Sequence, residues 1–258
     1  MLALSYTLLS ASLIFFVTAY ENPFAKCSIK NERCMGKEWE NVFLTVGSTG
    51  NGELNMDPID PMFFKNFAVA IADGVTFNVK DGAVKGFKNC KIPKYRINLE
   101  QKLESKNIVC DTLKITGKFE FGGTNPMLMS MFGTNSLNGH GEVKLKFEQV
   151  TMNLNLPITV LRKEDGEAYF KILDGTPQYT FDIQKAGFDI KHLVVGGNDI
   201  SEIASAFLTS NWRPLVQAFG RPLIDKALEF LIIFANKIYN NVPVKDFILE
   251  DLTPYVSN

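Results

Sequence analysis

The chain has 258 residues, a formal net charge of −1, and 21 phenylalanines against 2 tryptophans and 2 histidines. A charge balance so close to zero argues against nucleic acid or an anionic membrane as the main partner. The length suits one large domain or two small ones. The many phenylalanines carry apolar surface that either fills a core or lines a cavity.

The first stretch of the chain, residues 2–19, is apolar and has no charged side chain. It ends in Val17-Thr18-Ala19, a pattern of small and compact residues that is typical of a secretory signal peptide cut after Ala19. A membrane anchor is the alternative, but the run is at the short edge of the ~20 residues needed to span a bilayer. We therefore expect a signal peptide over residues 1–19 and a single secreted domain over residues 20–258.

The chain has four cysteines: Cys27, Cys34, Cys90 and Cys110. In a secreted protein an even count favours disulfides over metal ligation, and no C-x-x-C pair or histidine cluster points to zinc. Cys27 and Cys34 close a short loop and are predicted to form a bridge. Cys90 and Cys110 would face each other if residues 98–105 form a hairpin turn, and two buried free thiols are the alternative.

Residues 60–74 have the pattern of a short helix. Pro61 suits the first turn of a helix, with Asp60 as its N-cap. Phe63, Phe67 and Ile71 then recur at a spacing of four, which predicts one apolar helical face ending before a glycine.

From residue 75 to about residue 190, apolar and polar residues alternate, which predicts strands with one apolar and one polar face. The apolar positions are Val75, Phe77, Val79, Leu113, Ile115, Phe119, Phe121, Val143, Leu145, Phe147, Met152, Leu154, Leu156, Tyr179, Phe181 and Ile183. The predicted turns are Asp81-Gly82, Asn138-Gly139, Asp165-Gly166 and Asp174-Gly175. Long consecutive strands with short turns favour an antiparallel meander. Residues 124–136 interrupt it with a methionine-rich stretch, and methionine adapts to irregular surfaces.

Two helices are predicted near the C-terminus. Residues 198–210 carry apolar side chains at helical spacing, and a longer helix follows over residues 213–240. Pro222 should kink the longer helix, and Val242-Pro243 should end it. Its far end is apolar nearly all round, which is typical of an enclosed helix.

The predicted fold is α+β, with a long curved antiparallel sheet wrapped around the C-terminal helix and an elongated hydrophobic tunnel between them. Motifs for a nucleophile elbow, a zinc protease and a phosphate-binding loop are absent. His140 and His192 fit solvated or packed histidines, and Glu164-Asp165 fits a solvated turn. We therefore expect no enzymatic activity, no cofactor and no metal.

The order of these features resembles the insect Takeout and juvenile-hormone-binding proteins, part of the wider group of tubular lipid-binding proteins. The resemblance is carried by the Cys27-x6-Cys34 loop, the Asp57-Pro58-Ile59-Asp60-Pro61 segment before the first predicted helix, the Gly139-x-Gly141 turn that opens GEVKLKFEQVTMNLNLPITV, and the segment from Phe207 to Phe247 with its Asn211-Trp212 start and Val242-Pro243 end. Together these features cover nearly the whole mature chain.

The resemblance implies a secreted carrier of a hydrophobic ligand. In the hormone binders the ligand is a sesquiterpenoid, and in Takeout-like members a longer lipid also fits. The hormone binders have their second bridge later in the chain, whereas no cysteine follows Cys110 here, so the pattern is closer to the Takeout branch. The alternatives are a membrane-active host-defence protein, a lipid-ester hydrolase, and a structural module with a solid core.

The expected partner is a hydrophobic small molecule or lipid, bound by a monomer with no nucleic acid and no stable membrane insertion. The side chains predicted to line the tunnel are Phe63, Phe67, Ile71, Phe119, Phe121, Met127, Met129, Met131, Phe219, Leu223, Ala227, Phe230 and Phe234.

Overall fold

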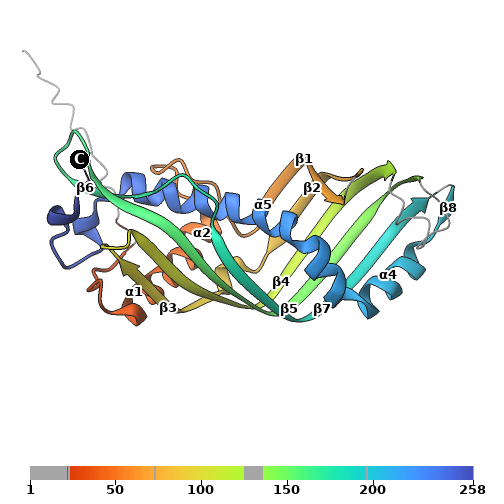
Figure 1. Cartoon of the computed structure of the whole chain (residues 1–258), viewed down its shortest axis with the longest axis horizontal. Coiled ribbons are helices and arrows are strands. Elements are labelled where there is room, and N and C mark those ends of the chain that lie inside the picture. Colours follow the sequence, from red (N-terminus) through yellow and green to blue (C-terminus); the bar gives the residue numbers. More distant parts are fainter. Residues whose placement is uncertain (1–21, 23, 73, 125–135, 196, 258) are drawn as a thin grey trace, which may run out of the picture.

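The computed structural model describes residues 22, 24–72, 74–124, 136–195 and 197–257, which form an elongated molecule with a curled sheet and one long helix (Figure 1). Residues 1–19 and Met127, Met129 and Met131 lie outside the described residues, so the signal peptide and these three predicted wall residues stay predictions. The helices are α1 (Glu32–Leu44), α2 (Val46–Thr49), α4 (Ser201–Ser210) and α5 (Trp212–Asn241). The strands are β1 (Met62–Ala72), β2 (Val75–Lys85), β3 (Lys91–Asn98), β4 (Leu103–Thr124), β5 (Ser136–Arg162), β6 (Ala168–Ile172), β7 (Gln178–Val195) and β8 (Asn198–Asp199).

The described strands form one eight-stranded sheet in the order β1-β2-β4-β5-β7-β8, with β3 added beside β4 and β6 beside β5. Every strand pairing in this sheet is antiparallel. The two longest strands, β4 and β5, stay in register from Leu103 opposite Pro157 to Thr124 opposite Ser136. The predicted antiparallel meander and the α+β class are therefore confirmed.

The sheet changes the face that it buries halfway along its long strands. Side chains alternate with a period of two, so buried positions of one face should be an even number of residues apart. The paired set Cys110, Val150 and Ile183 is followed by the paired set Leu113, Phe147 and Ala186, which is three residues away in each strand. This odd step divides the sheet into two halves, one beside α1 and one beside α4 (Figure 1).

The main core lies in the half beside α1. There the C-terminal part of α5 buries Leu228, Phe234 and Ile238. The ring of Phe234 packs against Phe43 of α1, with centroids 6.3 Å apart. The predicted long helix is thus present, with Pro222 inside it, but its far end is enclosed on one side only, because Ile233 is 53% exposed. In Figure 1, α5 runs along the sheet and bends toward α4 at its N-terminal end.

The predicted helix over residues 60–74 is wrong, because this segment forms β1, paired with β2 from Met62 opposite Val84 onward. A spacing of four is also a multiple of two, so the apolar pattern fits a strand equally well. Asp60 does not cap a helix. Its Oδ2 accepts hydrogen bonds from the N–H groups of Gly86 (3.0 Å) and Lys88 (2.9 Å), which hold the loop between β2 and β3.

Two of the predicted turns are also wrong, because both lie inside strands. Gly82 belongs to β2, and a Cβ at this position would sit 2.1 Å from the ring of Phe64. Gly139 belongs to β5, and a Cβ there would meet the ring of Phe121 at 2.7 Å. These glycines give room to aromatic rings on the neighbouring strand. The predicted turns at Asp165-Gly166 and Asp174-Gly175 are confirmed outside the strands.

The predicted Cys27–Cys34 disulfide is present, and Cys90 and Cys110, for which two free thiols were the alternative, form a second one. Cys27 lies before α1 and Cys34 lies in the first turn of this helix, which the sequence patterns did not predict. Asn31 caps α1 by accepting a hydrogen bond from the N–H of Cys34 at 3.1 Å. The second joins the start of the β3–β4 hairpin to the middle of β4, as the predicted turn requires.

The predicted C-terminal helices are confirmed as α4 and α5. The start of the first differs, because Asn198 lies in the short strand β8 and the helix begins at Ser201. None of the helices in the described part of the chain combines the length and the apolar character needed to cross a membrane.

A buried polar network fixes the C-terminal end of α5. The Tyr239 hydroxyl donates to Oε1 of Glu104 at 2.8 Å and is 2.8 Å from the Tyr95 hydroxyl. Lys106 forms an ion pair with the same Oε1 at 2.7 Å and lies over the ring of Trp39. This network joins α5 to β3, β4 and α1.

Candidate ligand-binding groove

The outer edge of β7 is covered by side-chain hydroxyls of α4. The hydroxyl oxygens of Ser201 and Ser205 accept hydrogen bonds from the N–H groups of Leu193 and Ile190, each at 2.9 Å. The hydroxyl of Thr209 accepts from the N–H of Phe188 at 3.2 Å. A spacing of four places all three hydroxyls on one side of a helix. They satisfy strand groups that an open sheet edge would leave unpaired.

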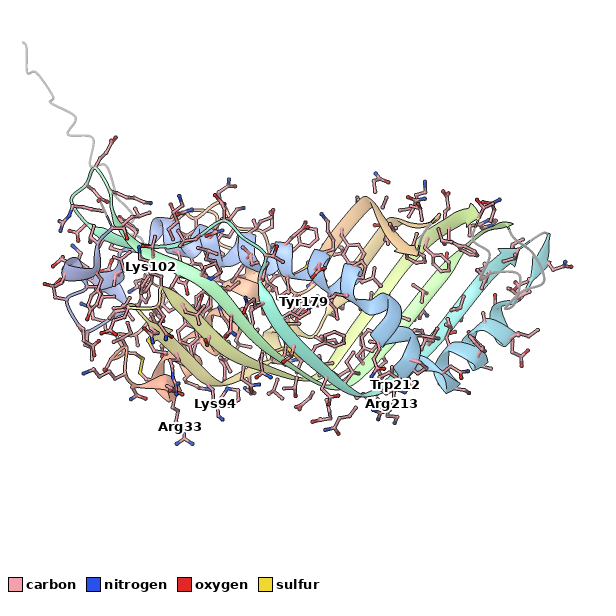
Figure 2. The ribbon with its side chains drawn as sticks, in the orientation of Figure 1. Arg33, Lys94, Lys102, Tyr179, Trp212 and Arg213 are labelled. Carbon is pink, nitrogen blue, oxygen red and sulfur yellow. A yellow bond between two sulfur atoms is a disulfide. The ribbon has the colours of Figure 1, made fainter. Side chains whose placement is uncertain are left out.

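The same side of the helical segment continues into α5 and faces an open groove. Arg213, Gln217 and Arg221 extend the spacing of four beyond Thr209, across the break at Asn211. Figure 2 shows Tyr179, Trp212 and Arg213 where the N-terminal half of α5 crosses β7. The groove between α5 and β7 has a volume of about 350 Å³ and is open on one side. Its lining residues are Tyr179, Thr180, Phe181, Asp182, Ile183, Trp212, Arg213, Val216, Gln217 and Arg221.

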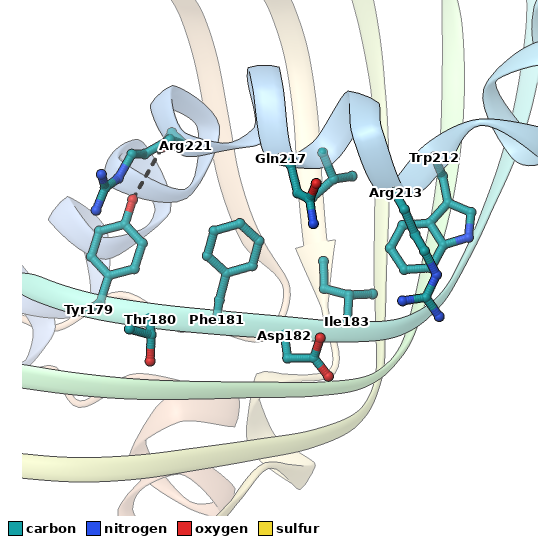
Figure 3. A pocket seen from close by; sticks show the side chains of 10 residues that line it. Tyr179, Thr180, Phe181, Asp182, Ile183, Trp212, Arg213, Gln217 and Arg221 are labelled. Carbon is teal, nitrogen blue, oxygen red and sulfur yellow. Dashed lines mark hydrogen bonds between the residues drawn. The ribbon is translucent and has the colours of Figure 1, made fainter.

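The sheet side of the groove is apolar because of strand alternation. Tyr179, Phe181 and Ile183 point from β7 toward α5, whereas Thr180 and Asp182 point away from it (Figure 3). The Tyr179 hydroxyl donates to Oδ1 of Asp225 at 2.6 Å, which closes one end of the groove. Burial, followed by this hydrogen bond to a carboxylate, raises the pKa of Tyr179, so its hydroxyl stays a donor.

The helix side of the groove combines apolar side chains with cationic ends. Trp212 and Val216 are half-buried against the core. The Arg213 guanidinium lies over the Trp212 ring at 4.6 Å and donates to the carbonyl oxygen of Gln184 at 3.2 Å. At the other end, Arg221 lies over the Tyr179 ring at 5.2 Å. The groove therefore presents an apolar floor between two guanidinium groups.

A second hollow of about 140 Å³ lies farther along α5, toward its C-terminal end. It is lined by Leu156, Pro157, Ile172, Leu173, Asp174, Gly175, Pro177, Ile232 and Asn236. Both hollows are bounded by α5 on one side and by the sheet or its turns on the other. Space next to the helix is thus found at two points along its length.

The predicted wall residues lie in three different environments. Phe119 is buried, with Phe77 and Phe121 rings at 4.9 and 6.2 Å, in the smaller core beside α4. Phe234 is buried in the main core, and Ala227 and Phe230 are half-buried on α5. Phe63 and Leu223 are exposed, at 66% and 40%. Phe67 and Ile71 belong to β1 and Phe219 to α5.

None of the residues that line the groove was among the predicted tunnel-wall residues. Its strand members appeared in the sequence only as one more alternating strand, and its helix members only as part of the predicted helix over residues 213–240. The readable signal was the polar spacing of four that runs from Ser201 to Arg221. The sequence gives no sign, however, that this stripe lies against β7.

The sequence matches the family model described as haemolymph juvenile hormone binding protein over residues 6–249. The chain belongs to this family. No match was found among curated proteins.

One solved structure shares the fold of this chain. The crystal structure of Takeout 1 from Epiphyas postvittana has a TM-score of 0.73 at 19% identity, over 86% of this chain and 98% of that chain. The crystal structure of a lipopolysaccharide binding protein has a TM-score of only 0.32 at 13% identity, over 83% of this chain and 39% of that chain. The expected resemblance to Takeout and juvenile-hormone-binding proteins is confirmed.

In this member of the juvenile hormone binding protein family, the groove offers aromatic rings and hydrogen-bond donors to a ligand. The described residues contain no group of three or more histidine, cysteine, aspartate or glutamate side chains placed to hold a metal. The aromatic rings of Tyr179, Phe181 and Trp212, together with fixed donors, suit recognition of a mainly apolar molecule.

Proposed function

We propose that this protein is a secreted carrier that binds an elongated hydrophobic ligand, a lipid or a terpenoid of the juvenile-hormone kind, without chemical conversion. The ligand lies along α5 on the concave side of the sheet, with the groove as one part of its site. Membership of a binding-protein family and the presence of two disulfides support this proposal.

The observation that carries the proposal is incomplete burial of apolar side chains in the sheet and on α5, together with the open groove between α5 and β7. Leu113, Ile115 and Phe147 in the sheet, and Val216 in α5, are half-buried rather than fully packed. Interiors are normally packed as densely as organic crystals, so such positions gain contacts when an apolar guest covers them.

The driving force is burial of apolar surface, which contributes roughly 25 cal/mol per Å² removed from water. A neutral ligand held in this way has no charge for salt to screen. Its affinity should therefore change little between low and high ionic strength. A steep salt dependence for a neutral ligand would point to binding outside an apolar site.

Mass spectrometry of organic extracts from the secreted, purified protein tests the proposal. We expect an apolar molecule in stoichiometric amount, which is absent from extracts of an unrelated secreted protein prepared in parallel. Empty extracts, combined with failure of the protein to bind a fluorescent lipid probe, would refute the carrier function.

A further inference from the structure

Arg213 is a cation with unused hydrogen-bonding capacity at one end of the groove. A guanidinium has five N–H donors, and Arg213 uses one of them on the Gln184 carbonyl. None of the ion pairs among the described residues includes Arg213. Its guanidinium carbon lies 4.6 Å from the centroid of the Trp212 ring, and the side chain is exposed.

The surroundings of Arg213 leave its charge available on the groove side. Asp182 is the one carboxylate among the lining residues, and its side chain points away from α5 (Figure 3). Gln217 is one helical turn from Arg213, and its amide points into the groove (Figure 3). Arg213 and Gln217 both line the groove, together with the apolar residues Ile183 and Val216.

The other end of the groove is less suited to an anion. Arg221 also lacks an ion-pair partner among the described residues, but the Tyr179 hydroxyl beside it is bonded to Asp225. A bound anion at that end would lie near the negative charge of Asp225. The two ends therefore differ in electrostatics although each has one arginine.

We propose that the ligand of this groove is a long-chain carboxylate, whose head group is bound by Arg213 and Gln217 and whose chain runs over Ile183 and Val216 along α5. The inference rests on the proposed carrier function and names the chemical class of its ligand. One guanidinium matches a monoanion, and its planar fork fits the two oxygens of a carboxylate. A volume of about 350 Å³ is at the lower end for ligand sites, so part of the chain extends beyond the groove.

The test compares palmitate with hexadecanol, its neutral counterpart of equal chain length, as competitors of a fluorescent lipid probe. At low salt the wild-type protein should bind palmitate about tenfold more tightly than hexadecanol, because a hydrogen bond to a charged group strengthens binding by about this factor or more. The advantage should shrink as salt rises, while hexadecanol binding stays constant.

The Arg213→Gln variant should lose the advantage of palmitate and keep its affinity for hexadecanol. Arg33→Gln is the matched control, because Arg33 is exposed on α1 at the other end of the molecule (Figure 2). An unchanged melting temperature in both variants shows that they fold.

The outcomes separate this inference from the carrier function. Equal affinity of the wild type for both competitors would overturn the inference and leave the carrier function standing. Retention of the palmitate advantage in Arg213→Gln, or its loss in Arg221→Gln alone, would place the head group elsewhere and also overturn it. Failure of both competitors to bind the wild type would contradict the carrier function itself.

Discussion

The hydroxyl of Tyr239 donates to Oε1 of Glu104 at 2.8 Å, inside a core where the Glu104 side chain is fully buried. This contact joins the C-terminal end of α5 to β4. The N-terminal half of the same helix has no fully buried side chain among the residues whose burial is described, and it borders the groove. One end of α5 is therefore buried in the main core, and the other borders the groove.

Replacing Tyr239 by phenylalanine should lower the free energy of unfolding by about 1–3 kcal/mol. The change removes a donor from a buried carboxylate whose Oε2 already has no hydrogen-bond partner among the described residues. Chemical denaturation measures the effect. Tyr255→Phe is the control, because Tyr255 is 45% exposed and its change should stay within about 0.5 kcal/mol. Equal losses in the two variants would show that the network does not stabilise the fold.

Alkaline pH should destabilise the protein through Tyr95 and Tyr239. Burial, and then the charge of Glu104, raise the pKa of both phenols well above their ordinary value. Below about pH 10 both states keep these protons, so stability is unaffected. Above about pH 10 the unfolded chain loses protons that the folded protein retains, so the free energy of unfolding falls.

Denaturation at rising pH, followed together with tyrosine absorbance, checks this prediction. Tyr239→Phe should show a shallower decline than the wild type, since one of the two phenols is gone. Complete ionisation of tyrosine while the protein is still folded would contradict the raised pKa values.

Much of the fold could be predicted from periodicity, and the errors have a physical cause. Alternation placed Val75, Leu145 and Ile183 correctly on strands, because alternating apolar and polar residues are the pattern of a strand with one buried face. The spacing of Phe63, Phe67 and Ile71 fits both a helix and a strand, and pairing with β2 decided between them. Gly82 was misassigned to a turn, because only the neighbouring strand shows that Phe64 occupies the space of its missing side chain.

Loss of Cys90–Cys110 should destabilise the protein more than loss of Cys27–Cys34. The sequence separations are 20 and 7 residues, and the larger closed loop restricts the unfolded chain more. Replacing both cysteines of a bridge by alanine should lower the free energy of unfolding by roughly 3 kcal/mol for Cys90–Cys110 and by roughly 2 kcal/mol for Cys27–Cys34. Denaturant unfolding of the two double variants gives the comparison, and the opposite order would count against a loop-closure origin.

Ser205→Ala should loosen the contact between α4 and the edge of β7. The N–H of Ile190 loses its acceptor, so its hydrogen exchange should accelerate by about fivefold, corresponding to one ordinary hydrogen bond. Ser210→Ala is the control, because this exposed hydroxyl has no hydrogen bond to the described residues. Unchanged exchange at Ile190 in Ser205→Ala would mean that apolar contacts alone hold α4 in place.

The groove could be predicted only in its parts. The stripe from Ser201 through Ser205 and Thr209 to Arg213 is visible in the sequence as a spacing of four. Its partner is a backbone edge, which has no residue signature. The odd step near Gln184 depends on three paired strands at once, and a single segment cannot reveal it.

The central claim is that the space between α5 and β7 holds the apolar ligand, and added bulk at Val216 tests it most directly. Val216→Phe should fill open space, keep the melting temperature and abolish binding of a fluorescent lipid probe. Ala235→Phe is the contrast, because Ala235 is buried in the main core and extra bulk there costs about 1–3 kcal/mol. A large fall in melting temperature for Val216→Phe, or wild-type probe binding by that variant, would contradict a ligand site in this groove.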